Sequence, residues 1–63
     1  MTKKRMDQVE IADYVTFVKC DGFDFEMASG LVTHISYANG ETTLFFDDGA
    51  AYNGFNSEII NIK

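Results

Sequence analysis

The 63-residue chain has no proline and no tryptophan, and it has a single cysteine, Cys20. One cysteine can form neither an internal disulfide nor a zinc site. Small secreted domains usually depend on disulfides, so this composition favours a reducing, intracellular setting such as the cytoplasm. Because proline is absent, nothing in the sequence interrupts the pairing of strands.

The chain also lacks any apolar run close to the roughly 20 residues that a membrane helix needs. Lys3, Lys4 and Arg5 resemble the charged start of a signal peptide, but residues 6–10, which follow them, are not an apolar segment. We therefore expect neither a membrane span nor a signal peptide. A chain of this length forms one domain, and its small size leaves no room for a catalytic cleft between lobes.

Basic residues are scarce and unevenly placed. Between Met6 and Ile62 the only base is Lys19, against all ten acidic residues, so the charge of this part is 1 − 10 = −9. Such a surface repels phosphate backbones, which argues against nucleic-acid binding outside the N-terminal tail. The acidity either keeps a small domain soluble or forms a face that binds a basic partner.

Residues 1–8 are polar and have no hydrophobic periodicity, so we expect a flexible basic leader there and a single domain over residues 9–63. Asp7 is an acceptable N-cap for a short helical turn. Within the domain, runs rich in β-branched and aromatic residues predict strands. These runs are residues 14–19, 30–37, 42–47, 50–52 and 58–62.

Alternation within these runs predicts which side chains share a face. Inward positions are expected at Val15 and Phe17, at Leu44 and Phe46, and at Ile60 and Ile62. In the second run, Val32 and Ile35 have opposite parity. A β-bulge between them would turn both towards one core.

The connections predict the topology. Asn39-Gly40 favours a type I′ hairpin turn, and Asp48-Gly49 favours a second tight turn. Residues 21–29 form either a long first loop or an irregular hairpin, and residues 53–57 favour a 3₁₀ turn before the last strand. Consecutive hairpins form an antiparallel meander, and so short a sheet must curl, so we predict an all-β, five-stranded barrel.

Four segments resemble the SH3-like barrels, a group that includes Tudor, KOW-type and other small bacterial or phage domains. Ile11-Ala12-Asp13-Tyr14-Val15 is similar to an I-G-D-x-V start of the first strand, and residues 30–35 to a G-x-V-x-x-I second strand. Residues 44–49 are similar to a V-x-F-x-D-G hairpin, and residues 55–62 to the closing turn and strand. Ala12 stands where the family usually has Gly. The resemblance implies ligand binding at the first loop and the aromatic face beside it.

Sequence patterns for metal or catalytic chemistry are weak. Asp21, Asp24 and Glu26 cluster in one predicted loop, but their D-x-x-D-x-E spacing is not that of a calcium-binding EF-hand. We interpret them as solvated loop acids and predict no metal and no cofactor. A nucleophile needs a base beside it, and nothing brings Cys20 to His34, so we predict no catalytic residue and no enzyme activity.

Nine aromatic residues exceed what so small a core needs. We assign Phe17, Phe46 and Phe55 to the core. Five further aromatics and the acids of the first loop form a candidate site for a protein partner. Its members are Asp21, Phe23, Asp24, Phe25, Glu26, Tyr37, Phe45 and Tyr52.

The main hypothesis is therefore a non-catalytic acidic binding module whose partner is a protein with a basic surface. Two alternatives stay open. The chain is a small inhibitor of the phage or mobile-element type that mimics DNA and occupies a nucleic-acid-binding groove of a host enzyme, or it is a structural homo-oligomer or assembly component. Nucleic-acid binding through the basic leader is a minor further alternative.

Overall fold

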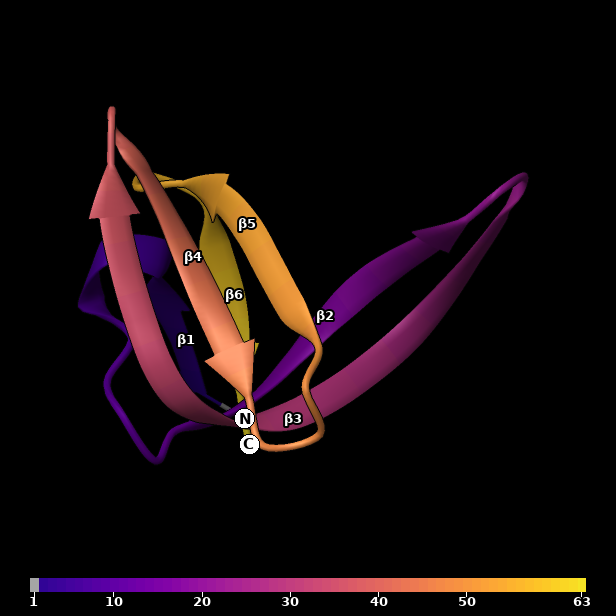
Figure 1. Ribbon diagram of the computed structural model, residues 1–63, viewed down its shortest axis with the longest axis horizontal. Coiled ribbons are helices and arrows are strands. Elements are labelled where there is room, and N and C mark those ends of the chain that lie inside the picture. The colour runs from indigo at the N-terminus through magenta and orange to yellow at the C-terminus, as the bar shows by residue number, and fades with distance from the viewer. Residues whose placement is uncertain (1) are drawn as a thin grey trace.

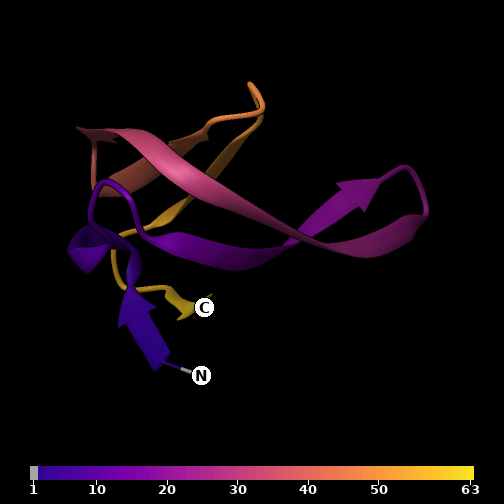
Figure 2. The same cartoon turned by 90° about the horizontal axis from the view of Figure 1, so that it is seen from below.

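The computed structural model describes residues 2–63, apart from the side chains of residues 19–21. The strands form one antiparallel sheet, ordered β1-β6-β2-β3-β4-β5, which coils around a single core (Figures 1 and 2). The two ends of the chain lie close together, since Thr2 pairs with Ile62. The elements are β1 (Thr2–Arg5), the 3₁₀ turn η1 (Met6–Gln8), β2 (Tyr14–Asp21), β3 (Asp24–Ala38), β4 (Glu41–Phe46), β5 (Ala51–Phe55) and β6 (Ile59–Ile62).

The predicted all-β class and antiparallel meander are confirmed, since β2, β3, β4 and β5 are neighbours in chain order. The predicted five-stranded closed barrel is wrong. Among the described residues there are six strands, and the sheet is open, with β1 and β5 as its two edges. The sixth strand is β1, which pairs with β6.

The predicted inward faces are confirmed. Val15, Phe17, Leu44, Phe46, Ile60 and Ile62 are all buried, as is Val32. The register between β3 and β4 shifts after Val32, so that Val32 pairs with Phe46 and His34 pairs with Phe45. This is the predicted bulge, and it lets Val32 lie in the core and Ile35 pack against it.

Two of the turns follow their sequence chemistry. Asn39 and Gly40 form a two-residue turn with φ values of +53° and +78°, as a type I′ hairpin requires. Gly49 has a φ of +88° in the tight turn between β4 and β5, which is closed by the hydrogen bond from the Phe46 N–H to the Ala50 carbonyl.

Two further connections can be compared with their predictions. Of the two alternatives for residues 21–29, the hairpin forms and the long first loop does not, because β2 and β3 continue to a two-residue turn. The 3₁₀ turn before the last strand is instead a simple turn, in which the Glu58 N–H donates to the Phe55 carbonyl at 3.0 Å. The 3₁₀ turn of the described residues is η1, near the N-terminus. Phe55 is also exposed, and not part of the core as predicted.

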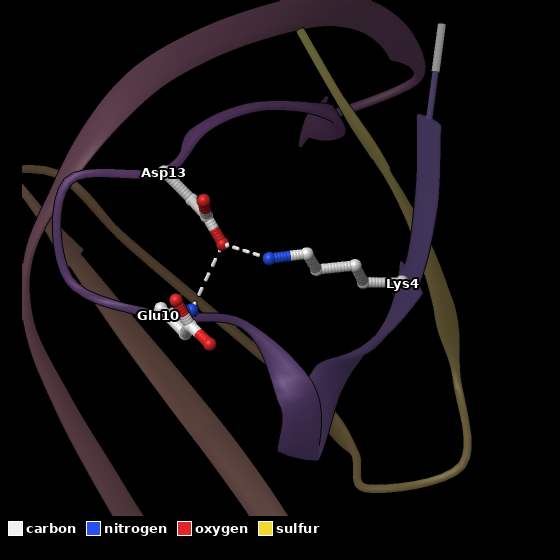
Figure 3. Close-up of polar contacts among 3 residues, drawn as sticks. All are labelled: Lys4, Glu10 and Asp13. Carbon is white, nitrogen blue, oxygen red and sulfur yellow. Dashed lines mark hydrogen bonds and ion pairs between the residues drawn. The ribbon is translucent and has the colours of Figure 1, made fainter.

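Residues 2–8, which lie in the predicted flexible leader, form β1 and η1 in the structure. Two side chains of this polar segment, those of Met6 and Lys4, contact the rest of the protein. Met6 is fully buried in the core, and its N–H donates to the Glu58 carbonyl at 2.8 Å. Lys4 reaches Asp13, which lies in the loop before β2 (Figure 3).

The Asp13 side chain links both ends of that loop to β1 through hydrogen bonds. Its Oδ2 atom accepts hydrogen bonds from Lys4 Nζ at 3.0 Å and from the Glu10 N–H at 2.9 Å (Figure 3). The hydrogen bond from Glu10 is the main reason why the pKa of Asp13 lies below its usual value, and Lys4 adds to it against the opposing effect of partial burial. The pKa of Lys4 is raised in turn, chiefly by its hydrogen bond to Asp13.

Ala12, beside Asp13, is a strained position. Its φ is +76°, in the left-handed region that costs an alanine about 1–2 kcal/mol. The backbone is fixed there because the Ala12 N–H donates to the Val32 carbonyl at 2.8 Å and the Asp13 N–H donates to the Glu10 carbonyl. A glycine at position 12, as in the SH3-like pattern, would relieve this strain.

We therefore expect Ala12→Gly to raise the free energy of unfolding by about 0.5–1 kcal/mol, since relief of strain exceeds the entropy that glycine adds to the unfolded chain. Urea denaturation measures this. Ala38→Gly, at a residue whose φ is not positive, is the matched control and should not stabilise the protein. A stability of Ala12→Gly at or below that of the wild type contradicts the strained loop.

The lowered pKa of Asp13 makes the stability of the fold depend on pH. A carboxyl whose pKa is lower in the folded than in the unfolded state stabilises the fold above its unfolded value, near 3.8, and this contribution is lost as the pH falls through the folded pKa. Asp13→Asn should therefore cost about 1 kcal/mol at pH 7, and the cost should shrink below pH 3.8. Urea denaturation from pH 7 to pH 2.5 measures it, with Asp24→Asn, an exposed acid, as the control. A cost that does not change with pH rules out this linkage.

Candidate protein-binding surface on the hairpin arm

The outer part of the β2–β3 hairpin projects away from the rest of the sheet (Figures 1 and 2). We call residues 18–27 the arm. Its register pairs Val18 with Met27 and residue 20 with Phe25, and it ends in the two-residue turn Gly22-Phe23. Gly22 has a φ of +67°, which suits the first position of a type II′ hairpin turn.

The arm begins where the core ends. The rings of Phe17 and Phe46 stack with their centroids 4.8 Å apart and their planes 2° apart, and Tyr52 packs on Phe17 at 5.3 Å. Gly30 allows this approach, because a Cβ atom there would lie 2.9 Å from two ring carbons of Phe46. Beyond this aromatic layer no described element packs over the hairpin, so both its faces meet solvent.

The polarity of the hairpin reverses at the aromatic layer. One face of the hairpin is buried at the base, where Ala28 is the last β3 side chain that packs on the core. Further towards the tip, alternation places Glu26 and Asp24 on this same face, and both are exposed. The opposite face starts with the polar pair Thr16 and Ser29. It then becomes apolar, with Val18, Met27 and Phe25 exposed by 51%, 66% and 75%.

We call Val18, Phe25 and Met27 the apolar face of the arm. Neighbouring residues on one strand face and directly paired residues across a hairpin lie about 5–7 Å apart, so these three side chains form one patch. Phe23, at the tip, is also fully exposed. An exposed cluster of aromatic and Met side chains is typical of a surface that another molecule covers.

The predicted site residues are only partly brought together. Phe23, Asp24, Phe25 and Glu26 all lie on the arm, but the acids occupy the face opposite Phe25. The side chain of Asp21 falls outside the described part of the chain, so its predicted role is not addressed.

The other three predicted residues lie away from the arm. Phe45 packs beside His34, with ring centroids 5.5 Å apart, on the outer face of β3 and β4. Tyr37 lies at the opposite end of β3, next to the Asn39-Gly40 turn. Tyr52 is half-buried on the core, where its hydroxyl donates to Glu58 Oε2 at 3.4 Å. Burial, and then the charge of Glu58, raise the pKa of Tyr52. Tyr52 is thus a packing residue.

Val18 and Met27 belong to the surface although sequence reasoning did not select them. The signal for Val18 was present, because with Val15 and Phe17 inward the alternation places Val18 outward. Met27 could be found only by treating residues 21–29 as a hairpin, since that register sets Met27 opposite Val18.

The N-terminal bases do not neutralise the acids of the arm. Lys4 pairs with Asp13 and Arg5 with Asp7, at 3.0 and 3.2 Å, so these bases compensate acids of the loop and of η1. Asp24 and Glu26 stay exposed on the arm. The N-terminal bases thus leave the negative charge of Asp24 and Glu26 to a partner, while the register sets residue 19 opposite Glu26.

Within residues 2–63, leaving aside the side chains of residues 19–21, no pocket is present and no three His, Cys, Asp or Glu side chains are grouped to hold a metal ion. In the same part of the chain, no helix is long and apolar enough to cross a membrane. The chain matches no family model, no curated protein and no solved structure.

Because the apolar face is exposed, its removal should leave the fold intact. We expect Phe25→Ala with Met27→Ala to change the free energy of unfolding by less than about 0.5 kcal/mol. Phe17→Leu, which breaks the aromatic layer at the base of the same hairpin, should cost about 1–3 kcal/mol. Urea denaturation compares the two. A loss of more than 1 kcal/mol in the arm variant would mean that the arm packs on the body.

Proposed function

We propose that the protein is a non-catalytic binding module that docks a basic protein surface through its hairpin arm. The observation that carries this proposal is the apolar face of the arm, three exposed side chains gathered on one side of a projecting hairpin. Aromatic and Met side chains are enriched where protein partners meet, and a projecting hairpin can enter a groove that a flat sheet cannot.

Charge supports the choice of a basic partner. Residues 6–62 carry a charge of 1 − 10 = −9, and two of the acids, Asp24 and Glu26, flank Phe25 in the sequence. Acids on the opposite face of the same arm steer a basic partner towards it and repel acidic competitors. Binding should therefore weaken with added salt while still depending on Phe25 and Met27.

The relationship to SH3-like domains and the cytoplasmic setting belong to the same proposal. The relationship to SH3-like domains is supported by the four similar segments, and by Ala12, which has a left-handed conformation where the family pattern has Gly. The cytoplasmic setting is supported by the single cysteine. The open six-stranded sheet differs from the closed barrel that is typical of that family.

Affinity capture from cells that make the protein tests the proposal. The arm variant is Phe25→Ala with Met27→Ala, and the matched control is Phe55→Ala with Ile59→Ala, which removes two side chains of similar exposure, 62% and 61%. We expect a protein that is retained by the wild type and the control, lost with the arm variant, and released by raised salt.

Two results would reject the arm as the docking element. One is capture of the same proteins by the wild type and the arm variant. The other is loss of capture in the control variant alone, which would move the site to Phe55 and Ile59, on either side of the turn between β5 and β6.

A further inference from the structure

The arm has a free backbone edge as well as an apolar face. Strand β3 pairs with β2 through residues 24–31 on one edge and with β4 through residues 32–38 on the other. The pairing on the β4 side extends only to Leu31, whose carbonyl accepts the Asp47 N–H at 3.1 Å. Among the described residues, no strand pairs with this edge from Asp24 to Gly30, and in Figure 1 β3 forms the lower of the two rims of the arm.

A free edge of this length is a template for another strand. Its outward N–H and C=O groups recur at every second residue and can form a ladder with an extended peptide. A strand added there would continue the line of β4, because β4 occupies the same edge of β3 just beyond it. This mode of recognition supplies affinity through the backbone and specificity through alternate side chains.

The two faces of the arm define what an added strand must carry. Side chains of adjacent strands meet on the same face, so one set of its residues would lie beside Phe25 and Met27, and the alternate set beside Asp24 and Glu26. The first set is therefore apolar. The second set is Lys or Arg, which would pair with the two carboxylates.

We propose that the arm captures its partner by strand addition along residues 24–30 of β3, and that the captured segment alternates apolar residues with Lys or Arg. This inference rests on the proposed function and names the mode of binding and the partner's chemistry. In this binding mode, Asp24 and Glu26 select an incoming strand that carries positive charge.

The same acids disfavour a second copy of this chain as the occupant. Pairing two such edges antiparallel over residues 24–30 would set Glu26 of one copy opposite Ala28 and diagonal to Glu26 of the other, and these two like charges on neighbouring strands repel. Charges on an edge strand are a common protection against self-pairing. The charges of the arm thus favour a basic strand over a second copy of the chain.

A designed peptide tests the inference on the full chain. The peptide alternates Lys with Val over a length that spans residues 24–30 at about 3.4 Å per residue. A second peptide has the same composition at helical spacing, and a third has Glu in place of Lys. NMR titration of the ¹⁵N-labelled protein should show saturable shifts of the amides of residues 24–30 with the first peptide only.

Backbone N-methylation separates strand addition from contact with the apolar face alone. An added strand donates hydrogen bonds from every second residue, so methylation of one alternate set of peptide nitrogens should weaken binding at least about tenfold, and methylation of the other set should not. Equal binding by both methylated peptides overturns the inference, as does no saturable binding up to about 1 mM. In either case, cellular capture that still requires Phe25 and Met27 leaves the proposed function standing.

A charge reversal in the protein supplies the matched variant. Asp24→Lys with Glu26→Lys changes two exposed side chains, so unchanged amide shifts in β4 and β5 should confirm that the fold is kept. The variant should lose the Lys-containing peptide and bind the Glu-containing one. Unaltered preference for the Lys-containing peptide, or wild-type dimers in sedimentation that dissociate on this charge reversal, would contradict the selection described above.

Discussion

The stack of Phe17 on Phe46 is the contact on which the shape of the protein depends. It joins β2 to β4 across the core at a centroid distance of 4.8 Å, and it is possible only because Gly30 leaves room for the Phe46 ring. It is also the outermost layer of the core. A chain of 63 residues cannot supply a further layer, so the hairpin beyond Phe17 stands in solvent with both faces uncovered.

The reversal of polarity beyond this layer links structure to function. If the arm had only to be soluble, polar side chains on both faces would suffice. Instead, the face opposite the core-facing side carries Val18, Phe25 and Met27, and the core-facing side carries acids. Together with the unpaired edge of β3, this gives one short element an apolar surface, a charged surface and a backbone template. The N-terminal strand supports the opposite part of the sheet, where buried Met6 and the Lys4–Asp13 pair hold it in place.

Much of the regular part of the fold follows from local sequence. Alternation identified the inward side chains of β2, β4 and β6, and the parity conflict between Val32 and Ile35 identified the bulge. Asn39-Gly40 identified its turn because both residues accept positive φ. The sequence predicts these features because each is decided by neighbours in the chain or by a clear division between an apolar and a polar face.

The features that sequence reasoning missed depend on partners far along the chain. Strand β1 is polar and exists because β6 offers an edge to it, while Met6 is a lone apolar residue whose burial has no periodic signal. The sequence leaves residues 21–29 open between a loop and a hairpin, because their acids and aromatics do not divide into the usual inner and outer faces. Phe55 was assigned to the core by residue type alone, although it pairs with Glu41 and faces outward.

The central claim is that the arm stands free of the body with its apolar face in solvent. Solution NMR with a soluble paramagnetic probe measures this most directly. The account predicts strong relaxation enhancement at the methyl groups of Val18 and Met27, with nuclear Overhauser contacts between these two residues and none from Met27 or Phe25 to Leu44 or Phe46. Protection of these methyl groups from the probe, with contacts from Phe25 to the core, would contradict it.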